Sequence, residues 1–109
     1  MKTVDKIQKL LETNIEDREG FQLKHHAKRV CCVGGLSLSI QASEYHYCSP
    51  RVNKPTGGYD CVEVGFPTRK LQKLKQYAEQ PMRMTKSVFG YVPIKELAEV
   101  IDDFGGIKE

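Results

Sequence analysis

Residues 36–43 run Leu-Ser-Leu-Ser-Ile-Gln-Ala-Ser, and this alternation of apolar and polar side chains is the strongest structural signal in the chain. Alternation with a period of two is typical of a strand that buries one face. It predicts a strand over Leu36–Cys48 with its even-numbered side chains inward. The alternation continues over Tyr59–Phe66, which we expect to be the partner strand, with Val62, Val64 and Phe66 inward.

Apolar residues at helical spacing flank these two strands. They predict three helices, over residues 3–14, 68–80 and 93–104. Thr3 and Thr68 are candidate N-caps of the first two, and Gly105-Gly106 would end the third. Residues 85–89 are a candidate third strand.

Residues 21–33 allow two interpretations. Leu23, Ala27 and Val30 fit a helix that ends at Gly34, and we prefer this interpretation. Alternatively, the apolar run over residues 30–33 is a strand that enters a hairpin at Gly34-Gly35.

These elements predict a single α+β domain over all 109 residues. We expect a small antiparallel sheet of two to three strands, with three to four helices packed on one face. An uncovered sheet face and an unpaired edge invite a partner strand, so we expect a homodimer.

The composition and patterning of the chain argue against a membrane-spanning protein and against a secreted one. The chain has no run of 18 apolar residues and no secretory signal pattern, so we expect a cytoplasmic protein, in the host cell if it is phage-encoded. The four cysteines lie at positions 31, 32, 48 and 61, without a CxxC pair. We therefore expect free thiols, no metal site and no cofactor.

Cys48, His46 and Glu63 are the residue types of a thiol nucleophile site. However, side chains two apart on a strand are separated by roughly 6–7 Å, which is too far for a nucleophile–base hydrogen bond. No complete catalytic constellation is present, so we expect no enzymatic activity.

The outward face of the two strands carries the candidate binding residues. It presents hydroxyls, an amide, phenols and a carboxylate, which can stack on an aromatic ring and hydrogen-bond to its edge. An ordinary solvated sheet face has a similar composition, so this alternative stays open. The residues concerned are Gln41, Ser43, Tyr45, Tyr47, Tyr59 and Glu63.

Basic side chains lie close to this face in the sequence. Arg51 and Lys54 are in the long, glycine-containing loop over residues 49–58, and Arg69 and Lys70 are in the first turn of the expected second helix. Cations at a helix N-terminus oppose the helix dipole, which suggests a bound anion or an acidic partner, although a solvated charged surface is equally compatible. Residues 51–75 have a net charge of +4 and residues 94–109 a net charge of −3.

Five short segments carry a resemblance. Gln41–Ser43, Tyr45–Arg51, Val62–Pro67, Tyr77–Glu79 and Gly90–Pro93 resemble a group of small uncharacterised bacteriophage and prophage proteins. The likeness extends from about Gly35 to Gly106 and brings no catalytic or ligand residues with it. It implies an accessory factor, and many such factors block bacterial immunity by occluding a CRISPR effector or another defence enzyme, or by sequestering a nucleotide signal.

Together these observations predict a non-enzymatic, phage-type binding protein that acts against host defence in an anti-CRISPR-like manner. In one mechanism the surface binds a nucleotide-like anionic ligand: Gln41, Ser43 and Glu63 contact the base edge, the three tyrosines stack, and Arg51, Lys54 and Arg69 hold phosphates. In the other mechanism the same surface docks on a host defence protein, with the tyrosines and Arg51 as anchors. The alternative function is weak binding of single-stranded nucleic acid.

Overall fold

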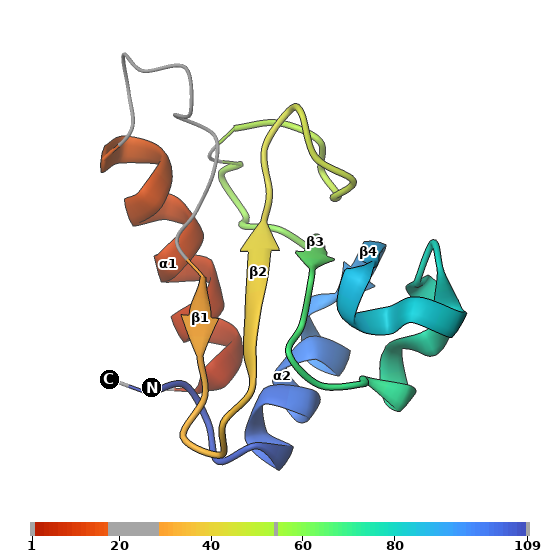
Figure 1. Cartoon of the computed structure of the whole chain (residues 1–109). Coiled ribbons are helices and arrows are strands. Elements are labelled where there is room, and N and C mark those ends of the chain that lie inside the picture. The colour runs from red at the N-terminus through yellow and green to blue at the C-terminus, as the bar shows by residue number, and fades with distance from the viewer. Residues whose placement is uncertain (1, 18–28, 54, 109) are drawn as a thin grey trace.

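The computed structural model describes residues 2–17, 29–53 and 55–108, with the backbone alone for 13–17. Its elements follow the order α1, β1, β2, β3, η1, η2, β4, α2 (Figure 1), where η marks a 3₁₀-helix. The helices are α1 (Thr3–Asp17) and α2 (Ile94–Asp103), with η1 (Gln72–Tyr77) and η2 (Pro81–Lys86). The strands are β1 (Val30–Cys31), β2 (Ser37–Gln41), β3 (Cys61–Gly65) and β4 (Val88–Pro93).

The strands form an open antiparallel sheet in the order β1-β2-β3-β4. The α+β class is therefore confirmed, but the sheet has four strands rather than two or three. In the pairing of β2 with β3, Ile40 lies opposite Val64 and Gln41 lies opposite Glu63. Val62 and Val64 are fully buried, as the alternation predicted.

Helices α1 and α2 lie together on one side of the sheet (Figure 1). The core between the helices and the sheet contains Ile7 and Leu11 from α1, and Leu97 and Ile101 from α2. The sheet contributes Leu38, Ile40, Val62, Val64, Phe89 and Val92. The opposite face of the sheet is consequently free of the two α-helices, and this outer face carries the candidate site.

Of the two interpretations of residues 21–33, the strand is confirmed at Val30–Cys31, and the helix is wrong over these residues. Residues 21–28 lie outside the described part of the chain. The Cys32 amide donates to the Leu36 carbonyl at 2.7 Å, and Gly35 has a φ of 96°. A three-residue hairpin loop requires this left-handed position, which glycine adopts at little cost. The hairpin therefore takes its geometry from Gly35.

The expected helix over residues 68–80 is replaced by the shorter η1. The Thr68 hydroxyl accepts a hydrogen bond from the Ser37 amide at 2.9 Å instead of capping a helix. At the other end, Ala78 is extended and forms a bridge with Phe89. These bonds at both ends compete with an α-helix for the same backbone and side-chain groups. The candidate strand over residues 85–89 is likewise displaced, to Val88–Pro93.

The two α-helices lie close to their predicted ranges, and α2 covers Ile94–Asp103 instead of 93–104. Helix α1 continues three residues beyond the expected end at Asn14, and it begins after Lys2, whose carbonyl accepts from the Lys6 amide. The Thr3 side chain bonds to Asp102 rather than capping the helix. Helix α2 follows Pro93, as expected.

Both edges of the sheet are bonded to other parts of the chain. Beside β1, Cys32 forms an antiparallel bridge with Ile107, and the Lys108 amide donates to the Cys31 carbonyl at 2.8 Å. Beside β4, the Glu79 amide donates to the Val88 carbonyl at 3.0 Å. These contacts occupy part of each edge, which leaves less of it to pair with a second chain. The homodimer stays a prediction.

Candidate functional site

Strand β2 ends at Gln41, seven residues before its expected end, because the chain turns at Ser43. The Ser43 hydroxyl accepts from the Tyr45 amide at 3.0 Å and lies 2.6 Å from Nδ1 of His46. A serine that bonds to nearby backbone in this way offers the chain an alternative to the sheet ladder. The turn directs residues 44–51 away from the strand.

Hydrogen bonds fix this segment to the outer face of the sheet. The Glu63 carboxylate on β3 accepts from the Tyr47 amide at 2.9 Å, and the Tyr47 carbonyl accepts from the Tyr91 amide at 3.0 Å. Ser49 pairs with Cys61 through an antiparallel bridge. Tyr47 is therefore held over β3 and β4 by its own backbone.

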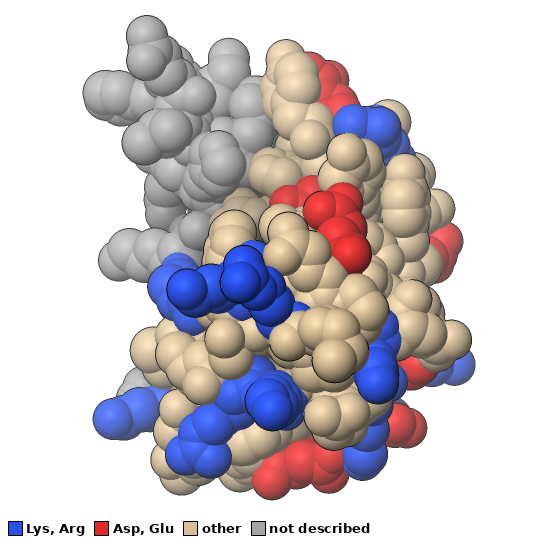
Figure 2. Space-filling model, turned by 45° about the vertical axis from the view of Figure 1, so that its right-hand side comes forward, with Lys and Arg blue, Asp and Glu red and all other residues tan. Residues whose placement is uncertain are grey.

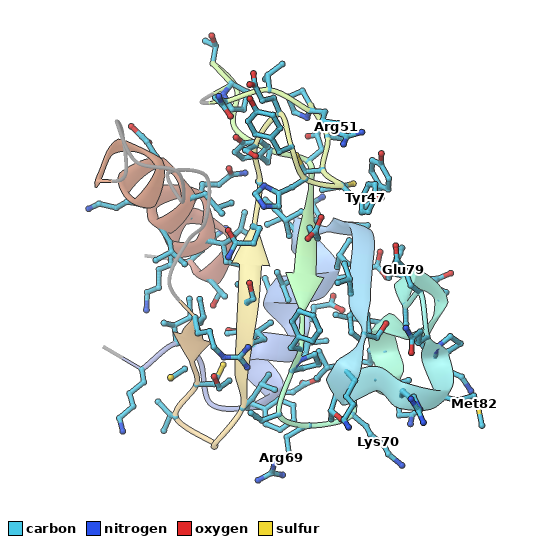
Figure 3. The ribbon with its side chains drawn as sticks, turned by 45° about the horizontal axis from the view of Figure 1, so that its top comes forward. Tyr47, Arg51, Arg69, Lys70, Glu79 and Met82 are labelled. Carbon is cyan, nitrogen blue, oxygen red and sulfur yellow. The ribbon has the colours of Figure 1, made fainter. Side chains whose placement is uncertain are left out.

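An exposed aromatic group results, which we call the tyrosine patch and define as Tyr47, Arg51 and Tyr91. The Tyr47 and Tyr91 rings are 6.0 Å apart between centroids and tilted by 41°, and the Arg51 guanidinium lies 5.5 Å from the Tyr47 centroid. Figure 3 shows Tyr47 and Arg51 next to each other at one end of the molecule. Tyr47 is 43% exposed and Tyr91 is 48% exposed. The patch can stack on a planar group and offer guanidinium and phenol donors.

A β-bulge in β4 places Tyr91 in the patch. Val62 pairs with Val92 and Val64 pairs with Phe89, so Gly90 and Tyr91 together lie opposite the single residue Glu63. Tyr91 has a φ of 53°, in the left-handed region that tyrosine rarely adopts. Bulges often re-aim a side chain at a functional site, and a left-handed backbone at a bulky residue costs about 1–2 kcal/mol. The fold thus carries a conformational cost at an exposed tyrosine.

Phe66 resembles Tyr91 in its positive φ and in its exposed aromatic side chain. Its φ is 49°, and its side chain is exposed although the alternation predicted it to be inward. The strand ends at Gly65, so the inward alternation no longer applies to the next residue. Within the described residues, the non-glycine positions with positive φ are Phe66 and Tyr91, and both are exposed aromatic residues.

Three of the residues predicted for the binding face are buried. Ser43 is 0% exposed and Tyr59 is 5% exposed, and Gln41 is also in the interior. The Tyr59 hydroxyl donates to the Val52 carbonyl at 2.8 Å, so this phenol braces the 49–58 loop rather than facing a ligand. The errors at Ser43 and Tyr59 follow from extending the strand alternation beyond Gln41 and before Cys61. Gln41 itself lies in β2, where its side-chain amide donates to the Ser39 hydroxyl.

The other predicted residues divide between two regions. Tyr47, Arg51 and Glu63 come together, and Tyr45 is exposed on the same segment. Arg69 and Lys70 are exposed before η1 begins, not in a helical turn, and Figure 3 places them at the opposite end of the molecule from Arg51. The basic residues therefore do not converge on one phosphate group. Lys54 lies outside the described residues.

The local geometry provides no nucleophile–base pair from Cys48, His46 and Glu63. The Cys48 thiol donates to the Ser43 carbonyl at 3.1 Å, and burial raises its pKa. Nδ1 of His46 is engaged with Ser43, and Glu63 accepts from the Tyr47 amide. A buried, protonated thiol is a poor nucleophile.

Within the described residues, no three His, Cys, Asp or Glu side chains are grouped as metal ligands; His25 and His26 are outside that set. The same part of the chain has no helix that is both long enough and apolar enough to cross a membrane.

Tyr91 is the residue of this site that the sequence analysis missed. It lies between Gly90 and Val92 in a segment without clear alternation, and only the unusual glycine inside a strand indicated a bulge.

Comparisons of the chain with protein-family models, with curated protein sequences and with solved structures each return no match.

Proposed function

We propose that this chain is a non-enzymatic binding protein that docks on the surface of another protein through the tyrosine patch. The observation that carries the proposal is the left-handed backbone of Tyr91 in a bulge, which holds an exposed tyrosine beside Tyr47. Backbone strain that the surrounding structure holds in place is typical of functional positions. Tyrosine and arginine are also the residue types that dominate the binding free energy of protein interfaces.

The patch favours a protein over a nucleotide as its ligand. Ser43 and Tyr59, which would have read and stacked a base, are interior residues with other hydrogen-bond partners. The cations Arg51 and Arg69 are too far apart to bind one phosphate group together (Figure 3). Glu63 directly beneath the patch also disfavours a polyanion such as single-stranded nucleic acid.

The partner we propose is a component of host defence. This choice rests on the resemblance of residues 35–106 to small phage proteins, and the tyrosine patch supplies the surface by which such a component would be occluded. The test expresses the protein in bacterial strains that each carry one defence system and are infected with a sensitive phage. Restored plaque formation identifies the system, and its purified components then allow Kd to be measured.

Tyr47→Ala and Arg51→Ala should each weaken binding by about 1–3 kcal/mol and reduce plaque formation accordingly. Both side chains are exposed, so the melting temperature should change little. Lys95→Ala, an exposed position on α2, is the matched control and should leave Kd unchanged. Full activity of the folded Tyr47→Ala, Arg51→Ala double variant would refute the proposal, as would a nucleotide bound to the native protein in mass spectrometry.

A further inference from the structure

A second surface feature lies away from the tyrosine patch, between residue 70 and η2. It is an open cleft of about 250 Å³, lined by Lys70, Met82, Arg83, Met84, Thr85 and Lys86. We call it the basic cleft. In Figure 3, Lys70 and Met82 lie at the other end of the molecule from Tyr47 and Arg51, so the two surfaces are separate.

The local fold brings the cationic side chains together. Within η2, Arg83 has non-helical angles (φ −136°, ψ 55°), which divide the element into two short turns. Lys70 arrives from the segment that precedes η1. Three cations from two separate segments therefore line one cleft.

These cations lack partners within the described chain. The side chains of Lys70, Arg83 and Lys86 form no hydrogen bond or ion pair with any described residue, whereas nearby Lys73 bonds to Asp103 at 2.7 Å. Residues 69–86 carry six cationic side chains against the single carboxylate of Glu79, a net charge of +5 within a chain of net charge +3. Most of the Lys and Arg side chains on the face in Figure 2 also lie in its lower half. A cleft lined by charges of one sign attracts groups of the opposite sign, here acidic ones.

The apolar part of the cleft defines the ligand further. Met82 is 89% exposed, and Met84 lines the cleft beside it from a buried position. Methionine adapts to varied apolar surfaces and is frequent at sites that bind peptides. A free phosphate would leave Met82 in water, and an aliphatic side chain of a peptide would cover it more completely than the sugars of a nucleic-acid backbone. A volume of 250 Å³ is also below the usual range for small-molecule pockets.

We infer that the basic cleft binds an acidic segment of a partner protein in which carboxylates alternate with apolar side chains. The carboxylates pair with Lys70, Arg83 and Lys86, and an apolar side chain packs on Met82. This site does not depend on the tyrosine patch and can be tested without knowledge of the partner bound there.

The experiment measures fluorescence anisotropy with a labelled peptide of three Glu-Glu-Leu repeats, and with a matched peptide that has serine in place of leucine. The test variant combines Lys70→Gln, Arg83→Gln and Lys86→Gln. The control variant combines Lys9→Gln, Lys95→Gln and Lys108→Gln. These three lysines are exposed and lie outside the cleft, and their substitution removes the same net charge as the test variant. Melting temperatures verify that both variants fold.

The wild-type protein should bind the leucine peptide more tightly than the serine peptide. The cleft variant should raise Kd for the leucine peptide by about tenfold, because three partly exposed charge pairs are lost. The control variant should change Kd by less than about twofold, and Met82→Ser should abolish the preference for leucine.

Four outcomes would overturn the inference. The first is failure of the wild-type protein to bind either peptide, and the second is an equal loss in the cleft and control variants. The third is equal affinity of the wild type for the two peptides, which would indicate a simple anion site. The fourth is displacement of the leucine peptide by a thymidine oligonucleotide at lower concentration than by unlabelled peptide, which would indicate a nucleic-acid site.

Discussion

Substitution of Tyr91 by glycine and by alanine separates backbone strain from side-chain contacts. Both changes remove the same ring and its 6.0 Å contact with Tyr47, so they differ only in the methyl group at a φ of 53°. A left-handed backbone costs a residue with a Cβ about 1–2 kcal/mol, and glycine is largely exempt. Elsewhere glycine is less stable than alanine by about 0.5–1 kcal/mol, because it loses more chain entropy on folding. The two effects leave Tyr91→Gly more stable than Tyr91→Ala by about 0.5–1 kcal/mol.

Thermal unfolding followed by circular dichroism measures this difference. In a domain of this size, 1 kcal/mol corresponds to roughly 4–8 °C, so the glycine variant should melt about 2–8 °C above the alanine variant. Tyr47 has no positive φ, and Tyr47→Gly should therefore melt below Tyr47→Ala. Urea unfolding with equal m values would confirm that only stability has changed.

Equal stability of Tyr91→Ala and Tyr91→Gly would contradict this expectation, because the backbone at this position would then carry no strain. A second consequence concerns function. Both Tyr91 variants should bind the partner at the tyrosine patch more weakly, so the gain in stability for glycine should not restore binding. Phe66, with a φ of 49°, should show the same order of glycine and alanine.

Three further predictions concern the core and the thiols. Ile40→Ala should lower the free energy of unfolding by about 2–4 kcal/mol, because Ile40 is fully buried. Ser39→Ala, on the outer face, should change it by less than about 1 kcal/mol. If urea unfolding gave the reverse order, the register of β2 would be shifted by one residue. Iodoacetamide at pH 8 should modify the exposed Cys31 before the buried Cys48, whose pKa is raised by burial, and mass spectrometry of the alkylated peptides would reveal any opposite order. The third prediction concerns pH, because burial raises the pKa of the Cys48 thiol in the folded protein above its ordinary value of 9.0. The buried thiol therefore contributes fully to stability below about pH 9, and this contribution is lost as the pH rises further. The free energy of unfolding in urea should consequently be smaller at about pH 10 than at about pH 8.

Part of the candidate site followed from the sequence and part did not. The outward position of Glu63 was predictable, since it follows from the pairing of two alternating segments. Tyr47 lies on the same side for a different reason, because the turn at Ser43 and backbone bonds to Glu63 and Tyr91 hold it there. The burial of Ser43 and Tyr59 was not, because it depends on where the strands end. That boundary is set by a serine hydroxyl that bonds to a neighbouring amide, and serine has this option in a strand as well as in a turn.

The grouping of the basic residues in the cleft could not be predicted from the sequence either. The apolar spacing that includes the buried Leu71 and Leu74 predicted a helix over residues 68–80, where the structure has η1. The Ala78 bridge to Phe89 and the Thr68 bond to Ser37 compete with that helix, and both involve residues that are distant in the sequence. The grouping of Lys70 with Arg83 and Lys86 depends on this rearrangement.

The sequence by itself determined the α+β class, the pairing of β2 with β3 and the inward faces of α1 and α2. These features arise from the spacing of apolar residues, which repeats locally and requires no knowledge of distant neighbours. Only the tertiary structure decided the bulge at Tyr91, the tyrosine patch and the basic cleft. Each of them arises where segments far apart in the chain compete for the same hydrogen bonds and the same buried surface, and the outcome of that competition is a property of the whole fold.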